Sequence, residues 1–248
     1  MQILRRWWWL LPLLLIAALA GFVVWAETAA APMPEALAAL QTDEQVQVET
    51  ESWLTFTPTG RKPEVGLVLY PGARVDPRAY APTARALSEK GYLVVIVPMP
   101  LDLAFFAPDR AADVIAAFPE IRDWAVGGHS LGGAMAARFA LQNPDLVQGL
   151  VLWAAYPAAT DDLSANSIVA TSIYATLDGL ATGDKIDASR PLLPSSTTWV
   201  AIEGGNHAQF GWYGSQAGDG IATISRAQQQ AQIVEATRML LSRMAGGE

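Results

Sequence analysis

Residues 123–142 read DWAVGGHSLGGAMAARFALQ, and this stretch decides which fold the sequence predicts. Residues 123–127 form a short and mostly apolar run, as a buried parallel strand does, and residues 131–142 have the spacing of a helix. Between the two lies the pattern G-x-S-x-G, with Ser130 as its serine. The order strand, turn, helix predicts a sharp turn that presents the Ser130 hydroxyl as a nucleophile at the head of a helix. The alternative is an ordinary glycine-rich turn for phosphate, but no P-loop lysine follows.

Apolar strands and helical segments alternate along the rest of the chain. Further strand candidates are Val65–Tyr70, Tyr92–Val97, Leu150–Ala155, Ile168–Thr176 and Thr197–Glu203, and helix candidates are Pro77–Lys90, Asp109–Phe118 and Ser225–Met244. Val46–Thr57 alternates in part and indicates an early strand or hairpin. This alternation implies an α/β fold with a mostly parallel, doubly wound sheet and helices on both faces. Residues 157–167, between two of the strands, are too few for a large lid, so we expect a minimal cap.

The chain contains two histidines, and the second of them is the candidate general base. His207 lies in the sequence EGGNH, just past the last predicted strand, although it also fits a surface loop. An imidazole titrates near neutrality, which suits proton transfer from Ser130. His129 directly precedes Ser130, and neighbouring side chains on such a turn point apart. We therefore expect His129 to pack or to orient its neighbours.

A third residue must fix the tautomer of the imidazole, and Asp178 is the candidate. It directly follows the strand predicted at residues 168–176, and the three residues stand in the chain order Ser, Asp, His. Five other aspartates stay open as alternatives, although each also fits a turn or a helix cap. They are Asp161, Asp162, Asp184, Asp187 and Asp219.

Three segments, GGHSLGGAMA, LVLYPGARVDPRAY and IEGGNHAQFGWYG, together carry a resemblance to a known family. They are similar to a bacterial branch of the α/β-hydrolase superfamily, the fold-5 or dienelactone-hydrolase-like group, over about residues 50–245. The resemblance implies the α/β-hydrolase fold and a Ser-His-Asp triad with its acid at Asp178. One departure matters, because dienelactone hydrolases carry cysteine where this chain has Ser130. Ester hydrolysis is therefore expected, rather than that specific activity.

The loop of residues 70–74, YPGAR, is the candidate second half of an oxyanion hole. In α/β-hydrolases the second donor comes from the loop after a central strand. Gly72 lets this backbone turn inward, so we expect the N–H of Ala73 to be paired with the N–H of Leu131. Arg74 is either a solvated loop arginine or a contact for a substrate carboxylate.

Apolar side chains near the ends of the strands are candidates for the substrate pocket, although those after the second central strand fit the core equally well. The candidates are Tyr70, Met99, Phe106 and Phe210. An open apolar cleft of this kind suits small to medium esters, lactones or thioesters, and the fold by itself does not fix the substrate.

Composition and charge exclude several classes of function. The net charge of −8, without a basic cluster, argues against nucleic acid as a partner. The absence of cysteine removes disulfides, thiol catalysis and cysteine-ligated metals. With only two histidines, a histidine-rich metal site is nearly excluded. We therefore expect chemistry that uses neither a metal nor an organic cofactor.

The N-terminus predicts a membrane helix. Residues 7–26 form an uncharged run long enough to cross about 30 Å of hydrocarbon, and Arg5 and Arg6 precede it. The positive-inside rule places the following domain on the extracytoplasmic side of the cell membrane. The alternatives are a signal peptide cleaved near Ala26–Ala31, which would release the domain, and a buried helix.

The sequence thus predicts three parts: a signal anchor at residues 1–27, a linker at 28–45 and an α/β-hydrolase domain at 46–248. We expect a carboxylesterase- or lactonase-like serine hydrolase that cleaves a small-molecule acyl substrate through an acyl-enzyme. One alternative is an acyltransferase or peptidase that uses the same triad. The other is a catalytically silent, membrane-tethered binding protein.

Overall fold

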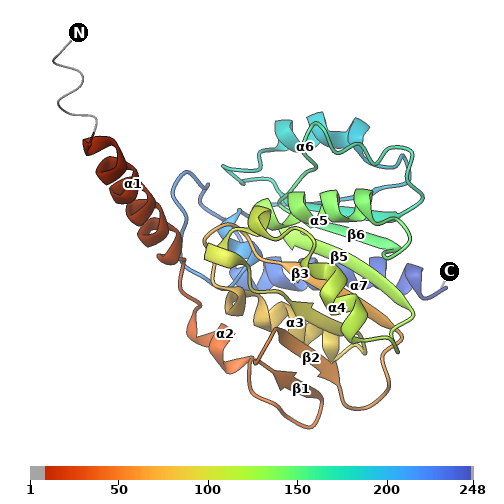
Figure 1. Cartoon of the computed structure of the whole chain (residues 1–248). Helices are drawn as coiled ribbons and strands as arrows, with labels where there is room; N and C mark the ends of the chain where they lie inside the picture. Colours follow the sequence, from red (N-terminus) through yellow and green to blue (C-terminus); the bar gives the residue numbers. More distant parts are fainter. Residues whose placement is uncertain (1–8, 247–248) are drawn as a thin grey trace.

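The computed structural model of the chain describes residues 9–246, which fold around one twisted sheet (Figure 1). The eight strands have the order β1-β2-β4-β3-β5-β6-β7-β8, and the strands from β4 to β8 in that order pair in parallel. The strands are β1 (Val46–Glu49), β2 (Leu54–Pro58), β3 (Val65–Tyr70), β4 (Leu93–Ile96), β5 (Asp123–His129), β6 (Gly149–Trp153), β7 (Val169–Ala175) and β8 (Thr198–Ile202). The prediction of a mostly parallel sheet is confirmed, and Val46–Thr57 becomes the antiparallel hairpin β1–β2.

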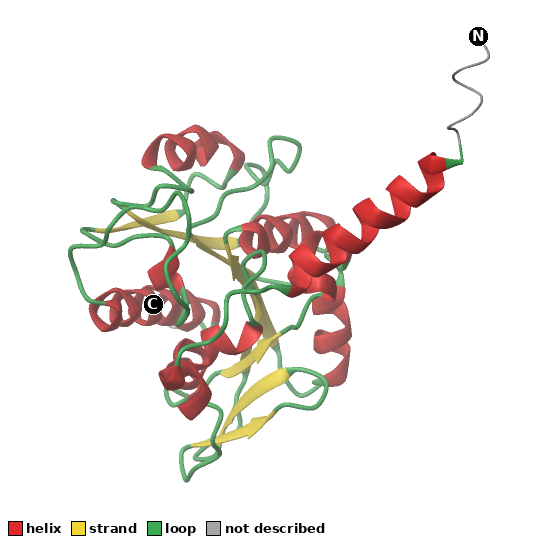
Figure 2. Ribbon diagram, turned by 90° about the vertical axis from the view of Figure 1, so that its left-hand side faces the viewer, coloured by secondary structure: helices red, strands yellow, loops and turns green. Residues whose placement is uncertain are grey.

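Helices cover both faces of the sheet, as Figure 2 shows. The helices are α1 (Leu10–Glu27), α2 (Pro34–Ala38), α3 (Ala81–Ser88), α4 (Arg110–Ala117), α5 (Leu131–Gln142), α6 (Gly183–Ser189) and α7 (Arg226–Met244). Side chains of α3 and α7 share one apolar core cluster, and those of α4 and α5 share a second one. Strands β3, β4 and β6 are buried along their whole length, because each face of the sheet is covered.

The predicted helix Pro77–Lys90 is divided in the structure. Residues Pro77–Tyr80 form the 3-10 helix η2, and α3 follows from Ala81. Pro82 stands in the first turn of α3, where a missing N–H leaves no hydrogen bond unmade. This division places Tyr80 at the junction of the two helices, with its ring fully buried.

Helix α7 begins where the sequence predicts a helix. The Ser225 side chain accepts a hydrogen bond from the N–H of Gln228, and the Gln228 side chain accepts one from the N–H of Ser225. This capping box satisfies two backbone donors that the first turn of a helix leaves without partners.

No helix or strand is described between the end of β6 and the start of β7, so a helical lid is absent from that connection. The helix α6 and the short 3-10 helix η5 (Arg190–Leu192) follow β7 instead. Figure 1 shows α6 at one end of the domain, beyond α5.

The N-terminal helix α1 extends away from the domain (Figure 1). Across residues 9–246, no helix combines the length and the apolar character that a membrane crossing requires. The predicted span begins at residue 7, and Arg5 and Arg6 also lie outside the described residues.

The segment of residues 28–45, predicted as a linker, lies against the domain. The N–H of Ala30 donates to the carbonyl of Arg74 at 2.7 Å, and the N–H of Met33 donates to the carbonyl of Trp212 at 2.8 Å. Ala36, in the short helix α2, is fully buried. This part of the chain therefore follows the domain surface and is fixed to it at several points.

Candidate active site

Ser130 occupies the turn between β5 and α5, with backbone angles φ 53° and ψ −123°. A residue other than glycine rarely adopts this positive φ, so contacts with the surrounding structure must hold the Ser130 backbone in this conformation. The enforcement comes from the close approach of α5 to the end of β3. A Cβ atom on Gly132 would lie 2.3 Å from the backbone oxygens of both Tyr70 and Pro71. Only glycine allows this approach, which holds Ser130 at the apex of the turn.

The N–H groups of Leu131 and Ala73 make no hydrogen bond to any residue in the described part of the chain. Leu131 is the first residue of α5, where the helix dipole adds partial positive charge. An oxyanion hole requires N–H groups that are free of other partners, and Leu131 also lines a cavity together with Ser130.

The loops after β7 and β8 bring Asp178 and His207 together. Oδ2 of Asp178 lies 2.8 Å from Nδ1 of His207, and both side chains are essentially inaccessible to solvent. Oδ1 of Asp178 accepts the N–H groups of Leu180 and Ala181, each at 2.7 Å. The carboxylate therefore has a hydrogen-bond donor at each oxygen, and the imidazole is held in one orientation.

A cavity of about 280 Å³ is lined by both Ser130 and His207. Nδ1 of His207 is engaged by Asp178, so Nε2 is the nitrogen that remains for a proton from Ser130. This Nε2 is buried and has no hydrogen-bond partner among residues 9–246. No hydrogen bond joins it to the Ser130 hydroxyl, as is common in active sites without substrate.

The alternative aspartates have other partners. Asp161 forms an ion pair with Arg138 at 3.0 Å, and Asp187 forms one with Arg190 at 2.8 Å. Asp162 accepts the N–H of Ser164 within its own turn. The Ser164 side chain, and secondly this N–H, lower the pKa of the Asp162 carboxyl. Asp184 lies in the first turn of α6.

Asp219 stands close to His207 but binds its backbone rather than its ring. The Asp219 carboxylate accepts the N–H of His207 at 3.0 Å, that of Ala208 at 2.8 Å and that of Gly179 at 3.3 Å. It thus joins the loop after β8 to the loop after β7. The sequence indicated Asp219 only as an alternative acid, because nothing local distinguishes these two uses of a carboxylate.

The four residues predicted to line the substrate pocket lie outside the cavity at Ser130. Tyr70 is buried, and its hydroxyl donates to the carbonyl of Pro108 and accepts the N–H of Ala111, which joins β3 to α4. Met99 is buried in the apolar cluster beside α4 and α5. Phe106 packs against Phe105 and Phe22, and Phe210 stacks on the ring of His129.

Four alanines contribute to the walls of the cavity instead. Besides Ser130 and His207, its walls are Leu131, Ala134, Ala154, Ala155, Tyr156, Leu180 and Ala181. Alanines after strands and in a first helical turn give no signal in a sequence, because they fit almost any environment. The positions that narrow the cavity were therefore not predicted.

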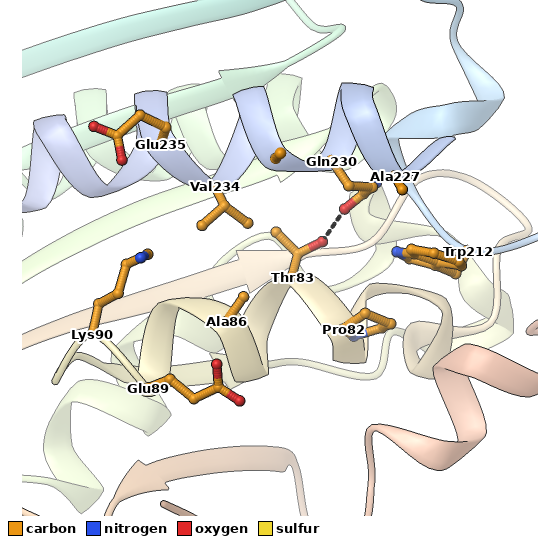
Figure 3. A pocket seen from close by; sticks show the side chains of 11 residues that line it. Pro82, Thr83, Ala86, Glu89, Lys90, Trp212, Ala227, Gln230, Val234 and Glu235 are labelled. Carbon is orange, nitrogen blue, oxygen red and sulfur yellow. Dashed lines mark hydrogen bonds between the residues drawn. The ribbon is translucent and has the colours of Figure 1, made fainter. Parts of the chain in front are cut away.

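A second hollow, of about 410 Å³, lies between α3 and α7 (Figure 3). Its floor contains the hydrogen bond from Thr83 to Gln230, and Lys90, Glu89 and Glu235 stand at one end. Ser130 and His207 do not line it. The candidate active site is therefore the smaller cavity, which Ser130 and His207 both line.

A mostly parallel sheet with a strained serine turn at its carboxyl edge and an Asp–His pair on later loops defines an α/β-hydrolase. A model of the alpha/beta hydrolase family matches residues 66–231, which is more than half of the chain, and the chain belongs to this family. No curated protein matches the chain. The esterase domain of a Rhodothermus marinus protein has a similar structure, with a TM-score of 0.57 and 13% identity over 77% of this chain and 92% of that chain. At that identity the likeness concerns the fold.

Proposed function

We propose that the protein is a serine hydrolase that acts on ester bonds. The observation that carries the proposal is the 2.8 Å contact of Asp178 with Nδ1 of His207, which leaves Nε2 free beside the cavity that Ser130 also lines. The esterase domain that shares the fold supports an ester as the substrate.

In the proposed reaction, Nε2 of His207 takes the proton of the Ser130 hydroxyl as its oxygen attacks the acyl carbonyl. The N–H groups of Ala73 and Leu131 stabilise the resulting oxyanion. Asp178 stabilises the imidazolium, which then gives its proton to the leaving alcohol. Water attacks the acyl-enzyme by the same steps and regenerates Ser130.

The substrate class follows from the size and lining of the cavity. A cavity of about 280 Å³ holds a short acyl group more readily than a long chain. The connection between β6 and β7 contains no described helix that would cover the opening. We therefore propose small to medium esters, including lactones, as substrates.

The test is reaction of the full chain with a fluorophosphonate probe, followed by mapping of the adduct. We expect labelling of Ser130 that disappears in Ser130→Ala and in His207→Ala. Ser172→Ala is the matched control, because it removes another buried serine hydroxyl, within β7. A panel of esters and lactones, with and without added alcohols, then separates hydrolysis from acyl transfer. Folded protein that does not react would instead support a silent binding protein.

We also propose that the apolar run of residues 7–26 anchors the enzyme in the cell membrane, with the catalytic domain outside. Its apolar sequence supports this, as does the exposure of α1 side chains such as Leu11, Leu14 and Ile16, each more than 60% exposed. Protease added to intact cells should remove the domain. Protection of the domain from protease would contradict this orientation, and release of the domain without protease would favour cleavage of a signal peptide.

A further inference from the structure

Tyr80 links the loop at Gly72 to the residue that precedes Ser130. Its hydroxyl accepts the N–H of Gly72 at 2.9 Å and lies 2.9 Å from Nδ1 of His129. A buried hydroxyl group also needs an acceptor for its own proton, and Nδ1 of His129 lies within hydrogen-bond distance of the Tyr80 hydroxyl. Donation from Tyr80 requires Nδ1 of His129 to be unprotonated, so that a neutral ring carries its proton on Nε2, which is buried without a hydrogen-bond partner among the described residues.

His129 is enclosed by aromatic rings. Its ring is parallel to that of Phe210 within 11°, at 5.6 Å, and its centroid lies 4.4 Å from that of His207. Burial, and secondly the neighbouring His207, lower the pKa of His129 well below its usual value. The backbone carbonyl of His207 opposes this shift. The ring therefore stays neutral and touches both the oxyanion loop and the loop of the base.

The same contacts determine which backbone N–H of the loop at Gly72 has no hydrogen-bond partner and is free to bind an oxyanion. A Cβ atom on Gly72 would lie 2.7 Å from Nδ1 of His129 and 3.0 Å from the Tyr80 hydroxyl, so the loop approaches as closely as a glycine allows. The N–H of Gly72 is used by Tyr80, whereas that of Ala73 has no partner among the described residues. Beyond it, the N–H of Arg74 donates to the carbonyl of Asp102 at 2.8 Å.

We propose that Tyr80 and His129 are positioning residues, which fix the loop at Gly72 against the end of β5 so that the N–H of Ala73 faces the oxyanion formed at Ser130. Because His129 directly precedes Ser130, two hydrogen bonds join the oxyanion loop to the backbone of the nucleophile. This inference rests on the proposed serine hydrolase function. Neither Tyr80 nor His129 lines the cavity at Ser130.

The first test is Tyr80→Phe, which removes one hydroxyl and retains the ring. Misplacing an oxyanion donor should lower kcat for an ester substrate about 10- to 100-fold with KM almost unchanged. Tyr213→Phe is the matched control, since Tyr213 is equally buried and its hydroxyl binds Gln216 instead. It should retain the kcat of the wild type. A Tyr80→Phe variant with the same kcat as Tyr213→Phe would overturn the proposal.

The second test does not depend on activity. The chain contains only two histidines, so nitrogen NMR of the full chain labelled with ¹⁵N-histidine reports two rings, which a His129→Asn variant assigns. We expect His129 to remain the Nε2–H tautomer from about pH 8 to pH 5.5, and Tyr80→Phe to shift its resonances. An Nδ1–H tautomer, or a charged ring in this range, would overturn the proposal. Wild-type protein with the expected tautomer but no reaction with esters or fluorophosphonate would overturn the proposed function instead.

Discussion

His207, in the loop after β8, and His129, at the end of β5, are both buried, and the two differ in the partner of Nδ1. In His207 that partner is the Asp178 carboxylate at 2.8 Å, and in His129 it is the Tyr80 hydroxyl at 2.9 Å. Both rings are about 1% exposed, so solvent stabilises the charged form of neither.

The difference places a histidine that contacts a carboxylate beside a histidine whose pKa is lowered by burial. A carboxylate stabilises an adjacent imidazolium, whereas a phenol does so only weakly, and burial otherwise favours the neutral ring. Burial in turn raises the pKa of Tyr80, so that its hydroxyl remains a donor. A neutral His129 adds no positive charge next to His207 during proton transfer.

Replacing the Asp178 carboxylate by an amide should have the largest effect, because it removes the group that distinguishes the surroundings of His207 from those of His129. In Asp178→Asn an amide N–H would face Nδ1 of His207, favour the wrong tautomer and lower kcat by about 10³- to 10⁴-fold. Steady-state kinetics on an ester substrate measures this loss. Asp184→Asn, which makes the same change on the exposed face of α6, should keep its activity. A loss below tenfold in Asp178→Asn would mean that another group orients the imidazole.

Replacing Asp219 should have a smaller effect, which we expect on the stability of the folded protein. Asp219→Ala removes the acceptor of the N–H groups of His207 and Ala208, and we expect the free energy of unfolding to fall by about 2 kcal/mol. Chemical denaturation of the full chain measures it. Asp187→Ala breaks only an exposed pair with Arg190 and should cost at most about 0.5 kcal/mol. Equal effects of the two substitutions would contradict a structural role for Asp219.

The smallest expected effect is a pH dependence of stability that comes from His129. Burial lowers its pKa in the folded protein, so below about pH 6.5 the unfolded chain binds a proton that the folded one does not. Above about pH 6.5 the neutral His129 makes its full contribution to the free energy of unfolding. As the pH falls below it, the free energy of unfolding decreases by at most about 1.4 kcal/mol per pH unit.

Comparison of the wild type with His129→Asn isolates this contribution, because the carboxylates titrate in both proteins. Denaturation at several pH values between about 7.5 and 5 should show a shallower decrease for the variant. Parallel curves would mean that His129 is protonated as readily in the folded protein as in the unfolded one.

Prediction from the sequence succeeded where the pattern is local. Val65–Tyr70 and Leu131–Gln142 have the bounds that were predicted, because a short apolar run and a helical repeat each carry their own signal. The strand at residue 123 continues two residues further than predicted, to His129, because pairing with β6 extends it. Helix α6 was not predicted, since its seven residues include only Ile186 and Ala188 as apolar positions.

The sequence by itself determined the alternation of strands and helices, the serine turn and the family to which the chain belongs. These depend on residue types at short spacing, which the chain displays directly. Only the tertiary structure decided the partners of Asp178 and Asp219, the alanine walls of the cavity and the contact between Tyr80 and His129. Each of these joins residues far apart in the chain, such as Tyr80 and His129 at a separation of 49 positions. Contacts of this kind arise from the packing of several elements and leave no local pattern.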